Sequence, residues 1–386
     1  MPLTQSSTSI PSQPASDLPA RAPSAPPHGE LAWIERIRQR AATTARGAGA
    51  LRLGIGDDCA ILAPPRGHEI VVTTDLSLEG RHFRRDWHPA RSVGHRALAR
   101  GLSDLAAMGA RPLAAFLSIA IPRAIAAEAK WVEGFLDGLL ALAAATKTPL
   151  AGGDTAEASC NDITIDIVLL GATPTGRALR RTGAQPGDRI FVTGALGGSA
   201  AELATLSSKT DRTTTRVPHS SAGAPFTRGL IAVEWAGKKP RTTGPSSPDH
   251  PHLYPQPRLA AGQSILRRRL ASACIDLSDG LSTDLAHLCT ASNVAAEIET
   301  ALLPLHPLTR TQSPEAALHS ALHGGEDYEL LFTAPPSASV PRNIAGVPLT
   351  RIGEIRRAGR NRPLMATIAA DGTRTPLEPG GWEHLK

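Results

Sequence analysis

Aspartate and glutamate recur beside glycine, serine or threonine in six short segments of this chain. Their carboxylate oxygens are the ligands that Mg²⁺ prefers, usually one or two per ion together with phosphate oxygens of a substrate. Several carboxylates gathered without a cation would repel one another. The segments are G-I-G-D-D-C-A (54–60), T-T-D (73–75), L-S-D-L-A-A-M-G (102–109), G-G-D-T (152–155), D-L-S-D-G-L (276–281) and G-G-E-D-Y-E (324–329).

Each segment alone has a simpler interpretation. Aspartate beside glycine is common in turns and at helix N-termini. Six such segments in one chain favour a shared site for magnesium and phosphate over six unrelated turns. Asp57, Asp327 and Glu329 only flank the motif positions, so we expect them to be structural.

The standard signatures of nucleotide-binding proteins and hydrolases are missing from the sequence. It contains no G-x-x-x-x-G-K-[ST] loop and no G-x-G-x-x-G after a strand. It also lacks the H-R-D and D-F-G pair of protein kinases, a G-x-S-x-G elbow and an H-E-x-x-H helix. Any phosphate chemistry must therefore rely on aspartate-held cations and backbone amides.

Composition limits the class of protein. A length of 386 residues predicts two domains. The net charge is +6, but much of the excess lies in residues 205–250, which we interpret as a solvated segment and not a nucleic-acid surface. The four cysteines form no C-x-x-C pair and fit a reducing cytoplasm. We expect no membrane helix, because no apolar run reaches about 18 residues.

The elements that must position the aspartates follow from periodicity. A helix is expected from near Glu30, a buried strand at 70–74 ending at Asp75, and a helix at 91–108 that carries Asp104 near its end. Further elements are a strand at 113–121, a helix at 124–146, strands at 163–170 and 189–193, a glycine-rich turn at 194–198 and a helix after it, helices at 259–270 and 281–292, and strands at 272–276, 329–333, 347–355 and 364–370.

We expect the chain to divide into a Pro/Ser-rich disordered tail (1–29), an N-terminal α/β domain (30–148), for which the family resemblance described next implies binding of ATP and magnesium, and a second α/β domain (149–386). The second domain contains a low-complexity insertion at 207–252, which we expect to lie away from every motif. Mixed strands and helices in two halves predict an α/β or α+β fold.

Taken in order, the six motifs closely resemble those of bacterial thiamine-monophosphate kinases, over residues 30–382 apart from the insertion. This family is grouped with aminoimidazole ribotide synthetase, selenophosphate synthetase and a hydrogenase-maturation dehydratase. The resemblance implies a two-domain architecture with an N-terminal domain that forms a homodimer. It also implies transfer of the γ-phosphoryl group of ATP to thiamine monophosphate, which gives thiamine diphosphate.

The resemblance assigns roles to matched residues. Those implied as magnesium ligands are Asp58, Thr73, Thr74, Asp75, Asp104, Asp154, Asp276 and Asp279. Those implied to contact ATP are Gly153, Asp154, Arg181 and Ser278. Those implied to face thiamine monophosphate are His82, Glu326 and Trp382. No residue is implied as a general base, because the acceptor phosphate is already ionised at neutral pH.

Alternatives remain open at this stage. Arg181 also fits a solvated surface side chain, His82 a structural histidine, and Trp382 an anchor in the core. The whole chain also fits another ATP-dependent enzyme of the same superfamily, or a non-catalytic module that binds magnesium and nucleotide.

Overall fold

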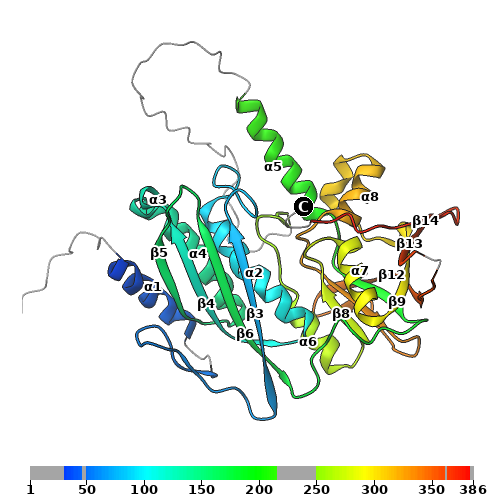
Figure 1. The fold of residues 1–386 in the computed structure, drawn as a ribbon, viewed down its shortest axis with the longest axis horizontal. Helices are drawn as coiled ribbons and strands as arrows, with labels where there is room; N and C mark the ends of the chain where they lie inside the picture. Colours follow the sequence, from blue (N-terminus) through cyan, green and yellow to red (C-terminus); the bar gives the residue numbers. More distant parts are fainter. Residues whose placement is uncertain (1–29, 46–48, 215–248, 361–362, 383–386) are drawn as a thin grey trace, which may run out of the picture.

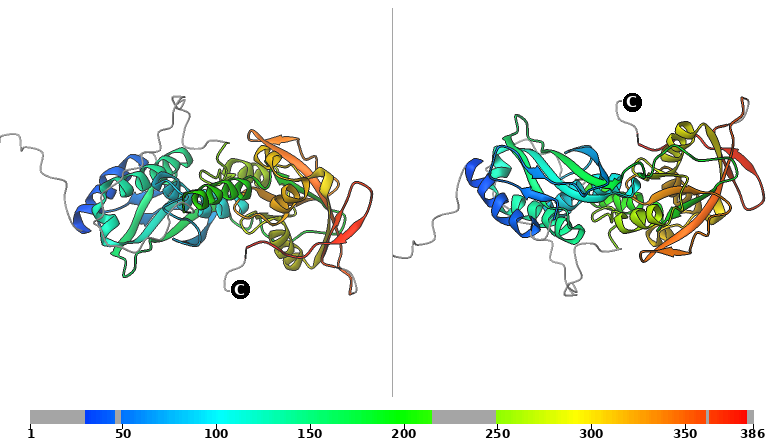
Figure 2. Two further views of the ribbon diagram at one scale, coloured as in Figure 1. Left: turned by 90° about the horizontal axis from the view of Figure 1, so that it is seen from above. Right: turned by 90° about the horizontal axis from the view of Figure 1, so that it is seen from below.

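The computed structural model describes residues 30–45, 49–214, 249–360 and 363–382. The expected tail at 1–29 and most of the insertion lie outside these ranges. The described chain forms two lobes, each built on its own β-sheet (Figure 2). Among the described helices, none combines the length and the apolar character needed to cross a membrane.

The first lobe contains a four-stranded sheet in the order β3-β6-β4-β5, with helices on one face (Figure 1). Its elements are α1 (Glu30–Ala45), β1 (Leu51–Leu53), β2 (Ile61–Leu62), β3 (His68–Leu78), α2 (Ala90–Ala107), β4 (Arg111–Ile121), α3 (Arg123–Ala127), α4 (Ala129–Thr146), β5 (Leu150–Glu157) and β6 (Thr164–Pro174).

Helix α2 is the central element of the molecule. Leu98 and Leu102 are fully buried, because α2 packs between the sheet, α4 and α6 (Leu259–Arg267). Its contact with α4 is close: a Cβ on Gly94 would lie 1.9 Å from the carbonyl oxygen of Phe135. The helix that carries Asp104 is therefore held rigidly on three sides.

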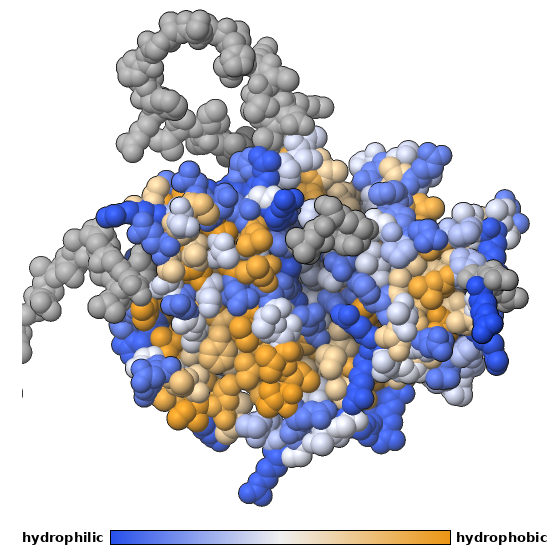
Figure 3. Space-filling view, viewed as in Figure 1, coloured by the Kyte–Doolittle hydropathy of each residue, from blue (hydrophilic) through white to orange (hydrophobic). Residues whose placement is uncertain are grey.

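The opposite face of the four-stranded sheet is open. Side chains alternate between faces along a strand, and on β3 the outward ones are apolar: Ile70 is 40% exposed, Val72 60% and Leu76 47%. Figure 3 shows apolar surface over this sheet. The expectation of a buried strand ending at Asp75 was therefore wrong: β3 is an edge strand covered on one side, and it continues to Leu78.

The second lobe contains an eight-stranded, mostly antiparallel sheet in the order β14-β13-β9-β12-β7-β10-β8, with β11 paired to β12. Its strands are β7 (Arg189–Thr193), β8 (Ala273–Asp276), β9 (Val294–Glu299), β10 (Leu330–Ala334), β11 (Asn343–Ile344), β12 (Val347–Arg357), β13 (Met365–Ile368) and β14 (Arg374–Pro376). Its helices are α5 (Gly198–Thr214), α7 (Leu281–Ser292) and α8 (Pro314–His323), with 3-10 turns at Thr300–Leu302 and Pro307–Thr311.

The predicted mixed α/β class is confirmed, but the sheets do not divide at 148/149. Strands β5 and β6 pair with β4 and β3, so the first sheet continues to Pro174. The expected helix at 124–146 is two helices that meet at Glu128. Which strands pair depends on contacts between segments that are distant in the sequence, and local periodicity does not predict such contacts.

Candidate active site

Three of the expected aspartates converge where the two lobes meet. Asp75 lies near the end of β3, Asp104 near the end of α2, and Asp276 at the end of β8. Burial raises the pKa of Asp75 to about 6, and burial together with the negative charge of Asp104 raises the pKa of Asp276 to about 7. Burial also raises the pKa of Asp104. The carboxylates are thus close enough to repel one another.

Polar neighbours orient these carboxylates. The hydroxyl of Thr73 donates to Oδ2 of Asp104, and the buried hydroxyl of Ser103 donates to Oδ2 of Asp276 over 2.8 Å. The positive charge of Arg181 partly offsets the raised pKa of both Asp104 and Asp276, although Arg181 is exposed. Its interpretation as a surface side chain and its expected place beside the acidic site are therefore both compatible with the structure.

A second group of expected residues surrounds the loop after β8. The backbone N–H of Glu326 donates to the carbonyl of Ser278 over 2.7 Å, and the N–H of Trp382 donates to the carbonyl of Asp279 over 3.1 Å. The carboxylate of Asp284 accepts bonds from the N–H groups of Asp279 and Gly280. Trp382 is 50% exposed, so it is not a core anchor.

The segment 324–329 is locally strained. Glu326 has φ +65° and Tyr328 φ +51°, in the left-handed region that side chains with a Cβ rarely adopt. Such residues cluster at functional sites, where the surrounding structure over-determines them. In this segment the acidic residues Asp327 and Glu329, which we expected to be structural, hold the backbone in place. Asp327 accepts bonds from the N–H groups of Gly197 and Ser199, and Glu329 binds Arg258.

Glu326 joins the lobes through a buried polar network. Its Oε1 accepts a bond of 2.6 Å from Nη2 of Arg96 on α2, and its Oε2 lies 3.3 Å from Nδ1 of His252. Burial alone would raise the pKa of Glu326, but the positive charges of Arg96, His252 and Arg100 together outweigh burial and hold the pKa at about 2. Nη2 of Arg96 also donates to the carbonyl of His82 over 3.2 Å.

His252 corrects the expectation for the insertion, which was taken to lie away from every motif. The ring is almost fully buried, and its Nε2 lies 2.9 Å from Nε2 of His88 while its Nδ1 lies 2.9 Å from the hydroxyl of Ser199. The end of the 207–252 segment therefore belongs to the site. The sequence analysis missed this contact because hydrogen bonds hold His252 in place, and the segment has no apolar repeat that would have indicated packing.

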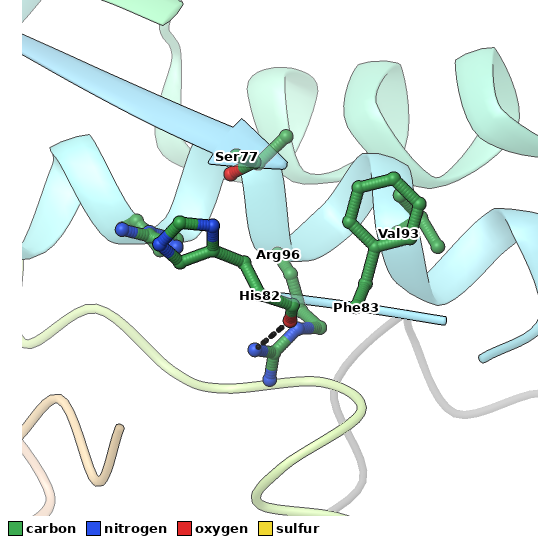
Figure 4. Close-up of a pocket in the computed structure, with 7 residues that line it drawn as sticks. Ser77, His82, Phe83, Val93 and Arg96 are labelled. Atoms are coloured by element: carbon green, nitrogen blue, oxygen red, sulfur yellow. Dashed lines mark hydrogen bonds between the residues drawn. The ribbon is translucent and has the colours of Figure 1, made fainter. Parts of the chain in front are cut away.

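Arg96 and Arg100 were also missed, although a signal was present. Arg96, Arg100 and Asp104 are spaced four residues apart on α2 and so lie on one face of the helix. Nη2 of Arg100 lies 2.7 Å from Oδ1 of Asp75. Together with Ser77, His82, Phe83, Val93 and Ala97, the two arginines line a small cavity (Figure 4).

Four further expected residues lie in the loop after β1, on β5 and on the open face of β3. Asp58 is exposed in the loop between β1 and β2, and Asp154 is exposed on β5, where it accepts the N–H of Thr155. Thr74 points to the open face of the sheet, opposite to Thr73. Gly153 is required by packing: at φ +151°, a Cβ there would lie 1.8 Å from a carbonyl oxygen of β4.

The donor set fits a hard cation that shares its coordination with a ligand. Within the described ranges, no three acidic, histidine or cysteine side chains converge closely enough to enclose a metal ion by themselves. Mg²⁺ does not need such a cage, because it keeps waters and takes substrate phosphates beside one or two carboxylates. Asp75, Asp104 and Asp276, whose repulsion a cation would relieve, are the residues that could hold it.

Comparisons with known proteins agree with this geometry. Residues 56–173 match the family described as AIR synthase related protein, N-terminal domain, and this match ends at the last residues of β6. A curated thiamine-monophosphate kinase of Escherichia coli K12 is 39% identical over 362 residues, which cover 92% of this chain and 98% of that protein.

Solved structures give the same result. The crystal structure of thiamine-monophosphate kinase from Stenotrophomonas maltophilia K279a has a TM-score of 0.64 at 35% identity, and the match covers 84% of this chain and 93% of that one. A structure described as AaThiL complexed with AMPPCP and TMP has a TM-score of 0.64 at 28% identity, covering 92% and 97%. The chain belongs to the thiamine-monophosphate kinase family.

Proposed function

We infer that this protein is a thiamine-monophosphate kinase, which transfers the γ-phosphoryl group of ATP to the phosphate of thiamine monophosphate and releases thiamine diphosphate and ADP. The observation that supports this most strongly is similarity to curated kinases over nearly the full length of both chains. These curated relatives also favour this function over those of the other ATP-dependent enzymes of the superfamily. The complex of the AaThiL relative with AMPPCP and TMP supports a nucleotide and a phosphate acceptor as joint ligands.

The chemistry suits the residues at the lobe junction. The acceptor phosphate is largely ionised at neutral pH, since its second pKa lies near 6, so no general base is needed. The difficulty is bringing two polyanions into line, which is a matter of orientation and charge. A Mg²⁺ ion held by these residues would supply positive charge that offsets the repulsion between the phosphates. The protein contributes the fixed carboxylates of Asp75, Asp104 and Asp276, together with the positive charge of Arg181, which acts on Asp104 and Asp276.

The remaining roles are proposed on the matched motifs. Thr73, Thr74, Asp58, Asp154 and Asp279 complete the magnesium ligands. Gly153, Asp154, Arg181 and Ser278 contact ATP, while His82, Glu326 and Trp382 contact thiamine monophosphate. The exposure of Asp58 and Asp154 is compatible with ligands that become ordered around bound nucleotide.

We also propose a homodimer in the cytoplasm, assembled through the first lobe. The open face of β3 supports this, because Ile70, Val72 and Leu76 form a row of exposed apolar side chains on a strand. The cysteines, free within the described ranges, fit a reducing compartment. Sedimentation at increasing protein concentration tests the assembly: a Val72→Glu variant should be monomeric where the unmodified protein is dimeric.

The function is tested by incubating the protein with ATP, Mg²⁺ and thiamine monophosphate and scoring thiamine diphosphate by chromatography. A parallel reaction with unphosphorylated thiamine separates a phosphate acceptor from a hydroxyl acceptor. Formation of thiamine diphosphate from the monophosphate, with no product from thiamine, is expected. Comparable kcat/KM for both would make a hydroxyl kinase the better description.

A further inference from the structure

Arg100 is a charged side chain of the site with unused hydrogen-bonding capacity. Its side chain is 15% exposed, and Nη2 contacts Asp75. Nε and Nη1 are both buried and have no hydrogen-bond partner. Buried guanidinium N–H groups without protein partners are costly, and either an ordered water or a bound ligand satisfies them in a folded protein.

The position of Arg100 indicates which ligand that is. On one side lies Asp75, a proposed magnesium ligand, and on the other lies the cavity that Arg100 shares with His82 and Arg96. The charge of Arg100 also acts on Glu326. Arg100 is therefore placed between the residues proposed to hold the metal and phosphoryl donor and those proposed to hold thiamine monophosphate. In an in-line transfer, the acceptor phosphate must occupy this intermediate position.

The geometry of the guanidinium favours an oxyanion. Its Nη2 group shares one edge with Nε and the other with Nη1. A phosphate that replaced Asp75 at Nη2 would gain a second, parallel bond on the same edge, which is the bidentate arrangement that arginine forms with phosphate. Asp75 would then be available to the cation. The ion pair between Arg100 and Asp75 satisfies both charges until substrate arrives.

We propose that Arg100 binds the acceptor phosphate of thiamine monophosphate and so distinguishes this substrate from unphosphorylated thiamine. The proposal rests on the function inferred above and adds the residue that recognises the acceptor group. Arg100 acts by positioning: it orients the attacking phosphate oxygen and takes no proton from it.

The test measures equilibrium binding and kinetics for Arg100→Met and Arg100→Lys. Arg85→Met is the control, because Arg85 is a half-buried arginine paired with Glu79 in the same lobe but outside the cavity. Removing two charge-assisted bonds should raise the dissociation constant of thiamine monophosphate about tenfold or more, measured by calorimetry without ATP. The dissociation constant of unphosphorylated thiamine should stay within about twofold, since thiamine lacks the phosphate that makes this contact.

Lysine keeps the charge without the planar fork, so Arg100→Lys should fall between the unmodified protein and Arg100→Met. An unchanged dissociation constant for thiamine monophosphate in Arg100→Met, or equal weakening for thiamine, overturns the proposal. If Arg100→Met does not fold, Arg100→Lys provides the test: its dissociation constant for thiamine monophosphate should rise more than its dissociation constant for thiamine. An unmodified protein that forms no thiamine diphosphate refutes the proposed function instead, so the two failures are distinguishable.

Discussion

Glu326→Gln should destabilise the protein by an amount that the structure allows us to work out. The substitution keeps the size of the side chain and removes the charge that faces Arg96, whose side chain is only 4% exposed. The pKa of Glu326 is held at about 2 instead of the ordinary 4.5. At about 1.4 kcal/mol per pKa unit, the ionised carboxylate contributes about 3 kcal/mol at neutral pH.

The stabilising contribution of Glu326 should depend on pH. Because the folded-state pKa is depressed, the contribution is fully present above about pH 4.5 and is lost as the pH falls toward 2. The difference in unfolding free energy between the unmodified protein and Glu326→Gln should therefore be constant from pH 5 to 8. It should shrink below about pH 4.

Urea unfolding monitored by tryptophan fluorescence measures the difference. Glu315→Gln is the control, because Glu315 is an exposed glutamate on α8 in the same lobe and should change stability by no more than about 0.5 kcal/mol. In a double-mutant cycle with Arg96→Met, the two effects should be less than additive. A loss below about 1 kcal/mol for Glu326→Gln, or full additivity with Arg96→Met, would refute the reasoning.

Three further predictions concern the site and its surroundings. Asp276→Asn should reduce kcat at least about 100-fold, because it removes a carboxylate from the acidic centre; near-normal turnover at limiting Mg²⁺ would reject its ligand role. The imidazoles of His88 and His95 should titrate near pH 4 in NMR spectra, because burial lowers the pKa of each; midpoints above pH 6 would contradict this. Replacing residues 215–248 with about 20 Gly/Ser residues should leave turnover within about threefold. The linker must run back along α5, and when extended it is longer than the ~25 Å length of that helix. A folded but inactive variant would place residues 215–248 in the site.

Much of the architecture could be predicted from local pattern. β7 was placed at its observed bounds because its β-branched and aromatic residues are bounded by turn residues, and α7 because its apolar repeat follows a glycine. β5 was not predicted, since Gly152 and Gly153 within it are typical of a turn. Those glycines are accommodated in a strand only because β4 approaches closely, which is a tertiary contact.

The candidate site shows the same division. The convergence of Asp75, Asp104 and Asp276 was expected from the ordered motifs, and the lobe junction brings them together. Apart from Arg181, the positively charged residues of the site were not expected. Arg96 and Arg100 read as ordinary helix positions, and His252 stands in a segment without periodicity. The four-residue spacing of Arg96, Arg100 and Asp104 places them on one face of α2, but the residues that they contact depend on tertiary packing, which no local pattern encodes.

The most direct test of the central claim follows the phosphoryl group itself. ATP labelled in its γ-phosphoryl group is incubated with the protein, Mg²⁺ and thiamine monophosphate, and the products are separated and counted. We expect one label in the terminal phosphate of thiamine diphosphate for each ADP released. Label that appears only as inorganic phosphate, or ADP released without labelled thiamine diphosphate, would contradict it.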